Sequence, residues 1–433
     1  MHVPRRRLLA LAGTLALAGC GDRGDRGDRE RRRTDPPSAV TPAGTSDDLA
    51  YTHVRPSGNR VLDGTGSVPD ATPRAVPFDG TPAWLVAAPT ERGSLWVVVA
   101  DDGRARGFEV RGGDRRDRAV SPARLDPGTP PALALDGGEP TLLVPPEGAS
   151  ALGHPVRLEG GALLFVADGD LVRRDADAEV RLPIDALPDA RIVQSGDVVA
   201  VLAGATDRYD HGVLGDGTEA GSVAVVDASE GLELRTRIEV GPPAVVEGIA
   251  SILADVTGDG RPDVIVTESD ADRGARVAAY AADGTRLAAG EPIGTGFRWR
   301  HQLAVAPFAP DAVPELAVVR TPHVGGVAEF YRARGDRLSV VATAERYGTH
   351  IIGSRNLDGA LAGDFDGDGR IELLLPTGDR TALAALRRTG DGVREAWTLP
   401  VGGAVRTNLA GVRGGDGRIV VGVGTDDGLR LWG

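Results

Sequence analysis

The sequence has 433 residues, of which 41% are hydrophobic and only 4% aromatic, and it contains 61 glycines and 30 prolines. This apolar content is sufficient for a core and excludes wholesale disorder, while the density of glycine and proline favours short strands over long helices. All 49 basic residues are arginine, which excludes lysine-dependent catalysis, and the net charge of −13 argues against nucleic acid as a partner.

The first 19 residues have the features of an export signal. Arginines at positions 5–7 precede an apolar run, Leu8 to Ala18, that is too short to span a bilayer. Small residues then lead to Cys20, the only cysteine, and this site resembles a bacterial lipobox. The resemblance implies that Cys20 is lipidated and that the chain is exported and anchored to the cell membrane or outer membrane, facing the periplasm or the exterior. The alternative is an ordinary signal peptide.

Residues 20–57 are expected to form a disordered tether. Gly-Asp-Arg triplets fill positions 21–29, and the stretch from Thr34 to Asp48 is rich in Pro, Ser, Thr and Gly. Such a segment cannot bury enough apolar surface to order itself. The folded body is therefore expected to occupy residues 58–433.

The body repeats a pattern of apolar strand, short polar turn and second apolar strand. The last turn residue recurs at positions 94, 141, 197, 263, 315, 372 and 420. A repeat of about 50 residues with short strands predicts an all-β fold, a β-propeller. Seven blades is the preferred count, with six or eight as alternatives. The last repeat is short, so the stretch from Arg60 to Phe78 is expected to complete it as an N-terminal strand clasp.

Two of these turns carry regularly spaced oxygen side chains. In Asp364–Glu372, acidic residues at positions 1, 3, 5 and 9 flank a glycine at position 6, and position 7 offers its backbone carbonyl. Such hard oxygen ligands suit Ca²⁺ better than Mg²⁺. An EF-hand is excluded because its position 12 would be glutamate, whereas here it is Leu375. The alternative is an Asp-Gly hairpin turn without an ion.

In this form the turns resemble the FG-GAP/VCBS repeat family, the calcium-loop β-propeller repeats also found in integrin α-subunits. The resemblance implies about two Ca²⁺ ions. The ligands of one would be Asp255, Thr257, Asp259, Asp263 and the carbonyl of Arg261; those of the other would be Asp364, Asp366, Asp368, Glu372 and the carbonyl of Arg370. Thr257 is a weaker ligand than aspartate, so the first site is expected to be the looser one. The degenerate copies ending at Glu315 and Val420 depart from the pattern and imply no metal.

Further polar side chains occur on the connections between repeats. They form a candidate ligand face of Arg208, Tyr209, Asp210, His211, Arg298, Trp299, His301, His323 and His350. Propellers collect such connections around a central channel, where histidines from several blades can converge on a metal or a substrate. The alternative is that each side chain satisfies a neighbouring backbone group or stacks at a junction between blades.

Two function hypotheses follow. No nucleophile-elbow, zinc-protease or dinucleotide motif is present, so no catalytic residue is assigned. The first hypothesis is a lipid-anchored, extracytoplasmic, calcium-binding propeller that acts as a binding or scaffold module for an unidentified protein or carbohydrate. The alternative is a lipoprotein enzyme, a hydrolase or lyase acting on polysaccharide through its His and Arg loops. It requires His211, His301, His323 and His350 to lie on one face within ligand reach of one another.

Overall fold

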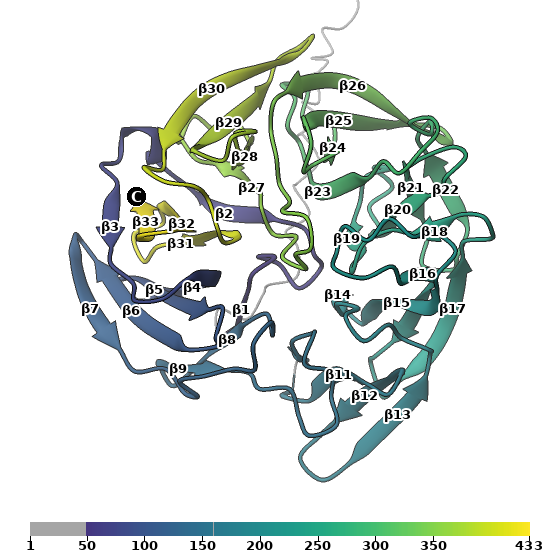
Figure 1. Ribbon diagram of the computed structural model, residues 1–433, viewed down its shortest axis with the longest axis horizontal. Helices are drawn as coiled ribbons and strands as arrows, with labels where there is room; N and C mark the ends of the chain where they lie inside the picture. The colour runs from purple at the N-terminus through teal and green to yellow at the C-terminus, as the bar shows by residue number, and fades with distance from the viewer. Residues whose placement is uncertain (1–48, 159) are drawn as a thin grey trace, which may run out of the picture. The chain divides into compact units, whose positions relative to one another are not determined.

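The computed structural model describes residues 49–158 and 160–433. The predicted signal, Cys20 and most of the predicted tether lie outside the described residues. The described part folds into β-strands and one short 3-10 helix, η1 (Val68–Asp70). Its sheets are arranged in a ring around a central axis, which confirms the predicted β-propeller (Figure 1). Within the described ranges, no helix has the length and apolarity needed to cross a membrane.

The strands follow one another around the ring as successive blades. Blade 1 contains β4 (Pro82–Thr90), β5 (Gly93–Ala100), β6 (Ala105–Arg111) and β7 (Asp114–Arg118). Blade 2 contains β8 (Ala132–Asp136) and β9 (Glu139–Leu142), with β1 (Leu49–Tyr51) added beside β8. Blade 3 contains β10 (Val156–Arg157), β11 (Leu163–Ala167), β12 (Asp170–Arg174) and β13 (Glu179–Pro183). Blade 4 contains β14 (Val193–Ser195), β15 (Val198–Thr206), β16 (Glu219–Asp227) and β17 (Glu233–Glu239).

The second half continues in the same way. Blade 5 contains β19 (Ile252–Ala254), β20 (Asp263–Ser269), β21 (Arg276–Tyr280) and β22 (Arg286–Ala289), and β18 (Val245–Val246) links it to blade 4. Blade 6 contains β23 (Arg300–Ala306), β24 (Glu315–Arg320), β25 (Val327–Arg334) and β26 (Arg337–Glu345). Blade 7 contains β27 (Leu361–Asp364), β28 (Glu372–Pro376), β29 (Ala382–Arg388) and β30 (Val393–Pro400), with β2 (Val61–Thr65) beside β27. Blade 8 contains β31 (Leu409–Arg413), β32 (Ile419–Thr425), β33 (Gly428–Trp432) and β3 (Arg74–Val76).

The described strands therefore form eight sheets around the ring: six four-stranded blades, the five-stranded blade 7, and a smaller three-stranded sheet, blade 2. The seven units recognised in the sequence differ from these in one respect. They treat blade 2 as a full unit and pass over blade 3, whose strands lie in the interval between Thr141 and Asp197. The predicted clasp is confirmed: Arg74, Ala75 and Val76 pair antiparallel with β33 as the outermost strand of blade 8. This pairing closes the ring.

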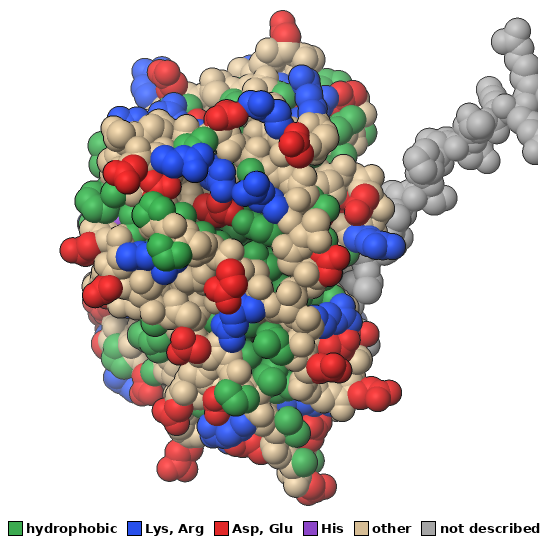
Figure 2. All heavy atoms as spheres, turned by 90° about the vertical axis from the view of Figure 1, so that its right-hand side faces the viewer, with side chains coloured by type: hydrophobic (Ala, Val, Ile, Leu, Met, Phe, Trp, Pro, Cys, Tyr) green, Lys and Arg blue, Asp and Glu red, His purple; other side chains and the backbone are tan. Residues whose placement is uncertain are grey.

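The core lies between neighbouring blades, where apolar faces of adjacent sheets meet. Between blades 8 and 1, for example, the fully buried Trp96 packs among Leu85, Phe108 and Leu431. Gly422 permits this contact, because a Cβ atom there would lie 2.6 Å from the Trp96 ring. On the outer edge seen in Figure 2, arginine and acidic side chains are interspersed. Burial therefore holds the blades together, and the polar outer edge faces solvent.

An unexpected feature is an inner strap, residues 49–60, that crosses the inner strands of several blades (Figure 1). After β1 joins blade 2, the strap makes backbone hydrogen bonds of 2.8–2.9 Å to blades 4, 5 and 7: Gln194 N to Pro56 O, Leu253 N to Ser57 O, and Ala362 N to Arg60 O. The Asn59 amide bonds the backbone of Val305 in blade 6 in both directions. The folded body therefore begins by Leu49, and the boundary expected at residue 58 falls inside the strap.

Asp358 holds the inner strap in the middle of the ring. Its carboxylate is fully buried and pairs with Arg60 at 3.0 Å and with Arg191 at 2.9 Å. Thr52 of the strap donates a further hydrogen bond of 2.6 Å. Burial alone would raise the pKa of Asp358, but the charges of Arg191 and Arg60 hold that pKa well below its usual range. The carboxylate thus remains ionised. It links the inner strap, through Arg60, and the connection between blades 3 and 4, through Arg191, to the segment that leads into blade 7.

Candidate functional site

The loop between β27 and β28 in blade 7 gathers three carboxylates. Asp364 ends one strand, Glu372 begins the next, and Gly369 makes the sharp turn between them with a φ of +84°. One oxygen each of Asp364, Asp366 and Glu372 lies within 4.8 Å of the others. Asp364 is only 5% exposed, and its Oδ1 has no hydrogen-bond partner among the described residues. The loop thus presents converging oxygens to a cation.

Arg387, on the neighbouring strand β29, occupies this loop from one side. It faces Glu372 across the sheet, and its guanidinium lies 2.6 Å from Glu372 and 2.8 Å from Asp368, and also contacts Asp366. Burial raises the pKa of Glu372 to about 7, although the hydrogen bond from Arg387 opposes the rise. A metal ion bound here would therefore compete with the Arg387 guanidinium for the same carboxylates.

The corresponding loop of blade 5 is arranged differently. The buried Asp263 accepts hydrogen bonds from the backbone of Val256 at 2.9 Å and of Thr257 at 3.0 Å. Asp255 accepts a 2.8 Å bond from Gly260, as Asp364 does from its own position-6 glycine at 3.1 Å. Among the described residues, however, only the blade 7 acids form a group with ligand atoms within 4.8 Å. The structure thus brings together three expected ligands in blade 7 but leaves those of blade 5 apart.

Blade 6 shows what happens when the loop loses its acids. Two carboxylates remain: Asp311 is exposed and pairs with Arg332 at 2.7 Å, and Glu315 is fully buried and pairs with Arg332 at 2.7 Å and with Arg388 of blade 7 at 2.9 Å. Arg332 stands opposite Glu315 as Arg387 stands opposite Glu372. In blade 6 the guanidinium groups of Arg332 and Arg388 therefore balance the charge of Glu315, in the position where a metal ion would do so in a complete acidic turn.

A second group of side chains gathers at the mouth of the central channel. We call it the channel-mouth cluster; its members are Tyr209, His211, Phe297, Trp299, His301, His323 and His350. The ring centroids of His211 and His323 lie 6.0 Å apart, and those of His323 and His350 lie 5.7 Å apart. Trp299 stacks on His301 at 4.8 Å and meets His350 edge-on at 5.1 Å. The four histidines named in the enzyme hypothesis therefore lie near one another, but among the described residues no three of them offer nitrogens that all lie within 4.8 Å of one another.

Chain topology explains this gathering. His211 and His323 lie between the second and third strands of blades 4 and 6, whereas Trp299 and His350 lie just before the first strands of blades 6 and 7. In an antiparallel blade these connections share one face of the ring. The acidic loop of blade 7 connects a first strand to a second one and lies on the opposite face. The molecule thus carries two separate candidate sites.

Several polar atoms of the channel-mouth cluster are buried without a hydrogen-bond partner among the described residues. They are Tyr209 Oη, Trp299 Nε1, His301 Nε2, His323 Nδ1 and His350 Nδ1. Burial lowers the pKa of His350 to about 4 and that of His301 well below its ordinary value, so both rings are neutral at neutral pH. Buried donors and acceptors usually have partners, so this concentration makes the cluster a candidate for binding water or a ligand.

Two buried glutamates adjoin the cluster and were not expected from the sequence. Glu247 is fully buried, lies 2.6 Å from Nδ1 of His211 and also accepts a hydrogen bond from Ser269. Burial raises its pKa, and burial together with the charge of Glu247 raises the pKa of Glu219 to about 9. The only sequence signal for Glu247 is its position as a lone charge in the apolar stretch from Val245 to Ile249.

The other residues of the expected ligand face have different positions. Arg208 is used structurally, since its guanidinium donates hydrogen bonds of 2.8 Å to the carbonyls of Ala244 and Val240. Asp210 and Arg298 are exposed, and no side-chain hydrogen bond joins them to the cluster within the described part of the chain. The ligand face is therefore narrower than expected and is centred on the histidines.

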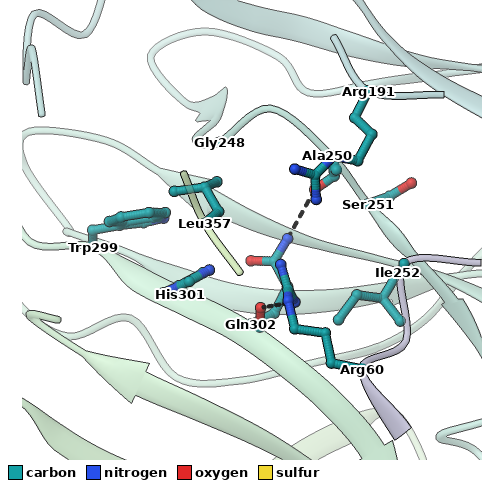
Figure 3. A pocket seen from close by; sticks show the side chains of 11 residues that line it. Arg60, Arg191, Gly248, Ala250, Ser251, Ile252, Trp299, His301, Gln302 and Leu357 are labelled. Atoms are coloured by element: carbon teal, nitrogen blue, oxygen red, sulfur yellow. Dashed lines mark hydrogen bonds between the residues drawn. The ribbon is translucent and has the colours of Figure 1, made fainter. Parts of the chain in front are cut away.

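A small cavity adjoins the cluster, and Trp299 and His301 line both. Figure 3 shows a small cavity in which Trp299 and His301 lie on one side and Arg60 and Arg191 on the other. Gln302 crosses it, donating a 3.0 Å hydrogen bond to the carbonyl of Ala250 and accepting one from Arg60 at its own carbonyl.

Comparisons with known proteins leave the family open. No protein-family model matches the chain, and no curated protein matches it significantly. Among solved structures, the chain is similar to the WD40 β-propeller domain of Doa1, with 10% identity, a TM-score of 0.40, and coverage of 84% of this chain and 96% of that one. It is also similar to BBS1N in complex with ARL6DN, with 11% identity, a TM-score of 0.43, and coverage of 85% and 97%. The propeller assignment rests on the arrangement of the sheets described above.

Proposed function

We propose that the chain is an exported, lipid-anchored β-propeller that binds Ca²⁺ in its acidic loops and serves as a binding or scaffold module with its ligand at the channel mouth. The observation that carries the calcium part is the convergence of Asp364, Asp366 and Glu372 around the unpartnered oxygen of Asp364. The anchoring part rests on the sequence around Cys20 and would connect the propeller to a membrane.

The acidic loop of blade 7 suits Ca²⁺ because its ligands are all oxygens. Carboxylates held this close repel one another, and a divalent cation relieves the repulsion more completely than one guanidinium. Asp364, Asp366, Asp368, Glu372 and the Arg370 carbonyl would hold the ion, while Arg387 would turn aside. In blade 5, Asp255, Thr257, Asp259, Asp263 and the Arg261 carbonyl would have to draw closer to form a site.

Calcium is expected to stabilise the chelator-stripped full chain. At a concentration about 100-fold above the dissociation constant, one occupied site adds about 2.7 kcal/mol to the free energy of unfolding, or about 3 °C in melting temperature for a chain of this size. Calorimetric titration and thermal melting measure both effects. D364N should abolish the blade 7 contribution, and R387Q should tighten binding by removing the competing charge.

The matched control for this experiment is D416N, which removes an exposed aspartate from the degenerate turn of blade 8. It should leave the calcium response unchanged. Absence of heat and of any melting shift at millimolar calcium in the full chain would disprove the calcium part of the proposal.

The geometry also favours a second candidate, an enzyme acting on polysaccharide. The specific observation is that His211, His301, His323 and His350 lie together beside two buried glutamates. Glu247 holds Nδ1 of His211 and leaves Nε2 to take a proton, while Glu219 stays protonated at neutral pH and can donate one.

If the protein is such an enzyme, the full chain should release unsaturated or reducing ends from a uronic-acid polysaccharide, and H211Q should lower that rate about 100-fold or more. A panel of polysaccharides that yields no turnover, or turnover equal in H211Q, would exclude this candidate.

A further inference from the structure

The small cavity of Figure 3 is lined by positive side chains. Arg60 extends into it from the inner strap and Arg191 from the connection between blades 3 and 4, and none of the described residues that line it is acidic. Among the described residues, the only carboxylate that pairs with either arginine is Asp358. One of its oxygens lies 3.0 Å from Arg60 and 2.9 Å from Arg191. Two buried guanidinium groups thus share one carboxylate, and one positive charge is left unbalanced.

The guanidinium of Arg191 has donors left for a further partner. Within the described part of the chain it donates only to Asp358, with bonds of 2.9 Å to Oδ1 and 3.0 Å to Oδ2. A guanidinium carries more N–H groups than these two bonds use. Arg191 is only 5% exposed, so bulk solvent supplies few acceptors for the others. Because a buried charge without a partner is costly, an anion beside Arg191 would stabilise the fold.

Two further nitrogens line the same cavity. Nε1 of Trp299 and Nε2 of His301 are buried and have no hydrogen-bond partner among the described residues. Nδ1 of His301 lies 2.9 Å from the Thr349 hydroxyl, so the ring can accept a hydrogen bond there and carry its own hydrogen on Nε2. Both rings lie across the cavity from Arg191 (Figure 3). An anion held by Arg191 would therefore face additional N–H groups.

The size of the cavity restricts the anion that it can hold. It offers about 10 Å³ of space for the centre of a water-sized molecule, which corresponds to one small occupant. Sulfate and phosphate are too large for this space. A water molecule would fit, but it would leave the extra positive charge unbalanced.

We propose that this cavity binds one small monovalent anion of the halide class, such as chloride, against the guanidinium of Arg191, with Trp299 and His301 as further donors. The anion balances the charge that Asp358 leaves over and thereby stabilises the junction between the inner strap and the ring. The site depends neither on calcium binding nor on which of the two candidate functions holds.

The test is thermal melting of the full chain at constant ionic strength, with sodium chloride replacing sodium gluconate. Chloride about 100-fold above its dissociation constant should raise the melting temperature by about 3 °C. R191Q should abolish this rise, because the charges of Arg60 and Asp358 then balance each other. The variant should still fold, since Asp358 keeps Arg60 and Thr52 as partners.

The matched control is R406Q, which removes an exposed arginine that pairs with Asp426 and should leave the chloride response unchanged. A crystal of the full chain soaked in sodium bromide gives a readout that requires no variant. We expect an anomalous bromide peak in the cavity, within hydrogen-bonding distance of the Arg191 guanidinium. The proposal is wrong if the cavity shows no such peak, if chloride does not shift the melting temperature, or if R191Q retains the wild-type shift.

Discussion

Replacing Asp358 by asparagine is expected to lower the free energy of unfolding by about 3–5 kcal/mol. The change leaves the guanidinium groups of Arg60 and Arg191 buried with no carboxylate between them. Removing one partner of a buried ion pair is costly because the remaining charge keeps its desolvation penalty. The inner strap also loses part of its anchor, since Thr52 donates to the same carboxylate. Urea unfolding followed by circular dichroism measures the loss.

The control for this variant is D63N. Asp63 pairs with Arg55 at 2.7 Å on the surface, where solvent screens the pair, so its loss should change stability little. If D358N and D63N proved equally stable, Asp358 would not be the anchor of the strap.

Truncation of the chain at residue 58 is expected to be more damaging than truncation at residue 49. The longer deletion removes β1 with the buried Tyr51 and the carbonyls of Pro56 and Ser57 that bond blades 4 and 5. Loss of one large buried aromatic side chain alone costs about 3–5 kcal/mol, and each lost hydrogen bond adds about 1 kcal/mol. The chain that begins at residue 58 should therefore melt far lower or fail to accumulate in soluble form.

The chain that begins at residue 49 provides the matched comparison. It retains every hydrogen bond of the described strap and should melt like the full chain. Equal melting temperatures for the two truncated chains would show that the strap contributes little to closure.

How much of the fold could be predicted depended on how strongly each blade repeats the pattern. Blades 5 and 7 were recognisable because an acidic turn precedes a buried apolar strand in each. Blade 3 was not, because β10 has only two residues and β13 carries the mostly exposed sequence from Glu179 to Pro183. The clasp was predictable from the missing strand of blade 8. The inner strap was not, because its partners lie far away in the sequence: Thr52 and Arg60 both bond Asp358, and the Asn59 amide bonds the backbone of Val305.

The candidate sites show a similar division. Individual members of these sites, such as Asp364 and His323, could be predicted because the turn pattern and the loop positions are visible in the sequence. Their partners could not. Arg387 reaches the acidic loop through cross-strand register with Glu372, and Glu247 reaches His211 from a different blade connection. Both relations depend on how strands pair in space and have no local sequence signature.

The most direct test of the proposed function is a crystal structure of the full chain soaked with a lanthanide, which replaces Ca²⁺ and gives a strong anomalous signal. We expect a peak within bonding distance of Asp364, Asp366 and Glu372, with the Arg387 guanidinium displaced, and a weaker peak beside Asp263 in blade 5. No anomalous peak at either loop, with Arg387 still bridging Asp366 and Glu372, would contradict it.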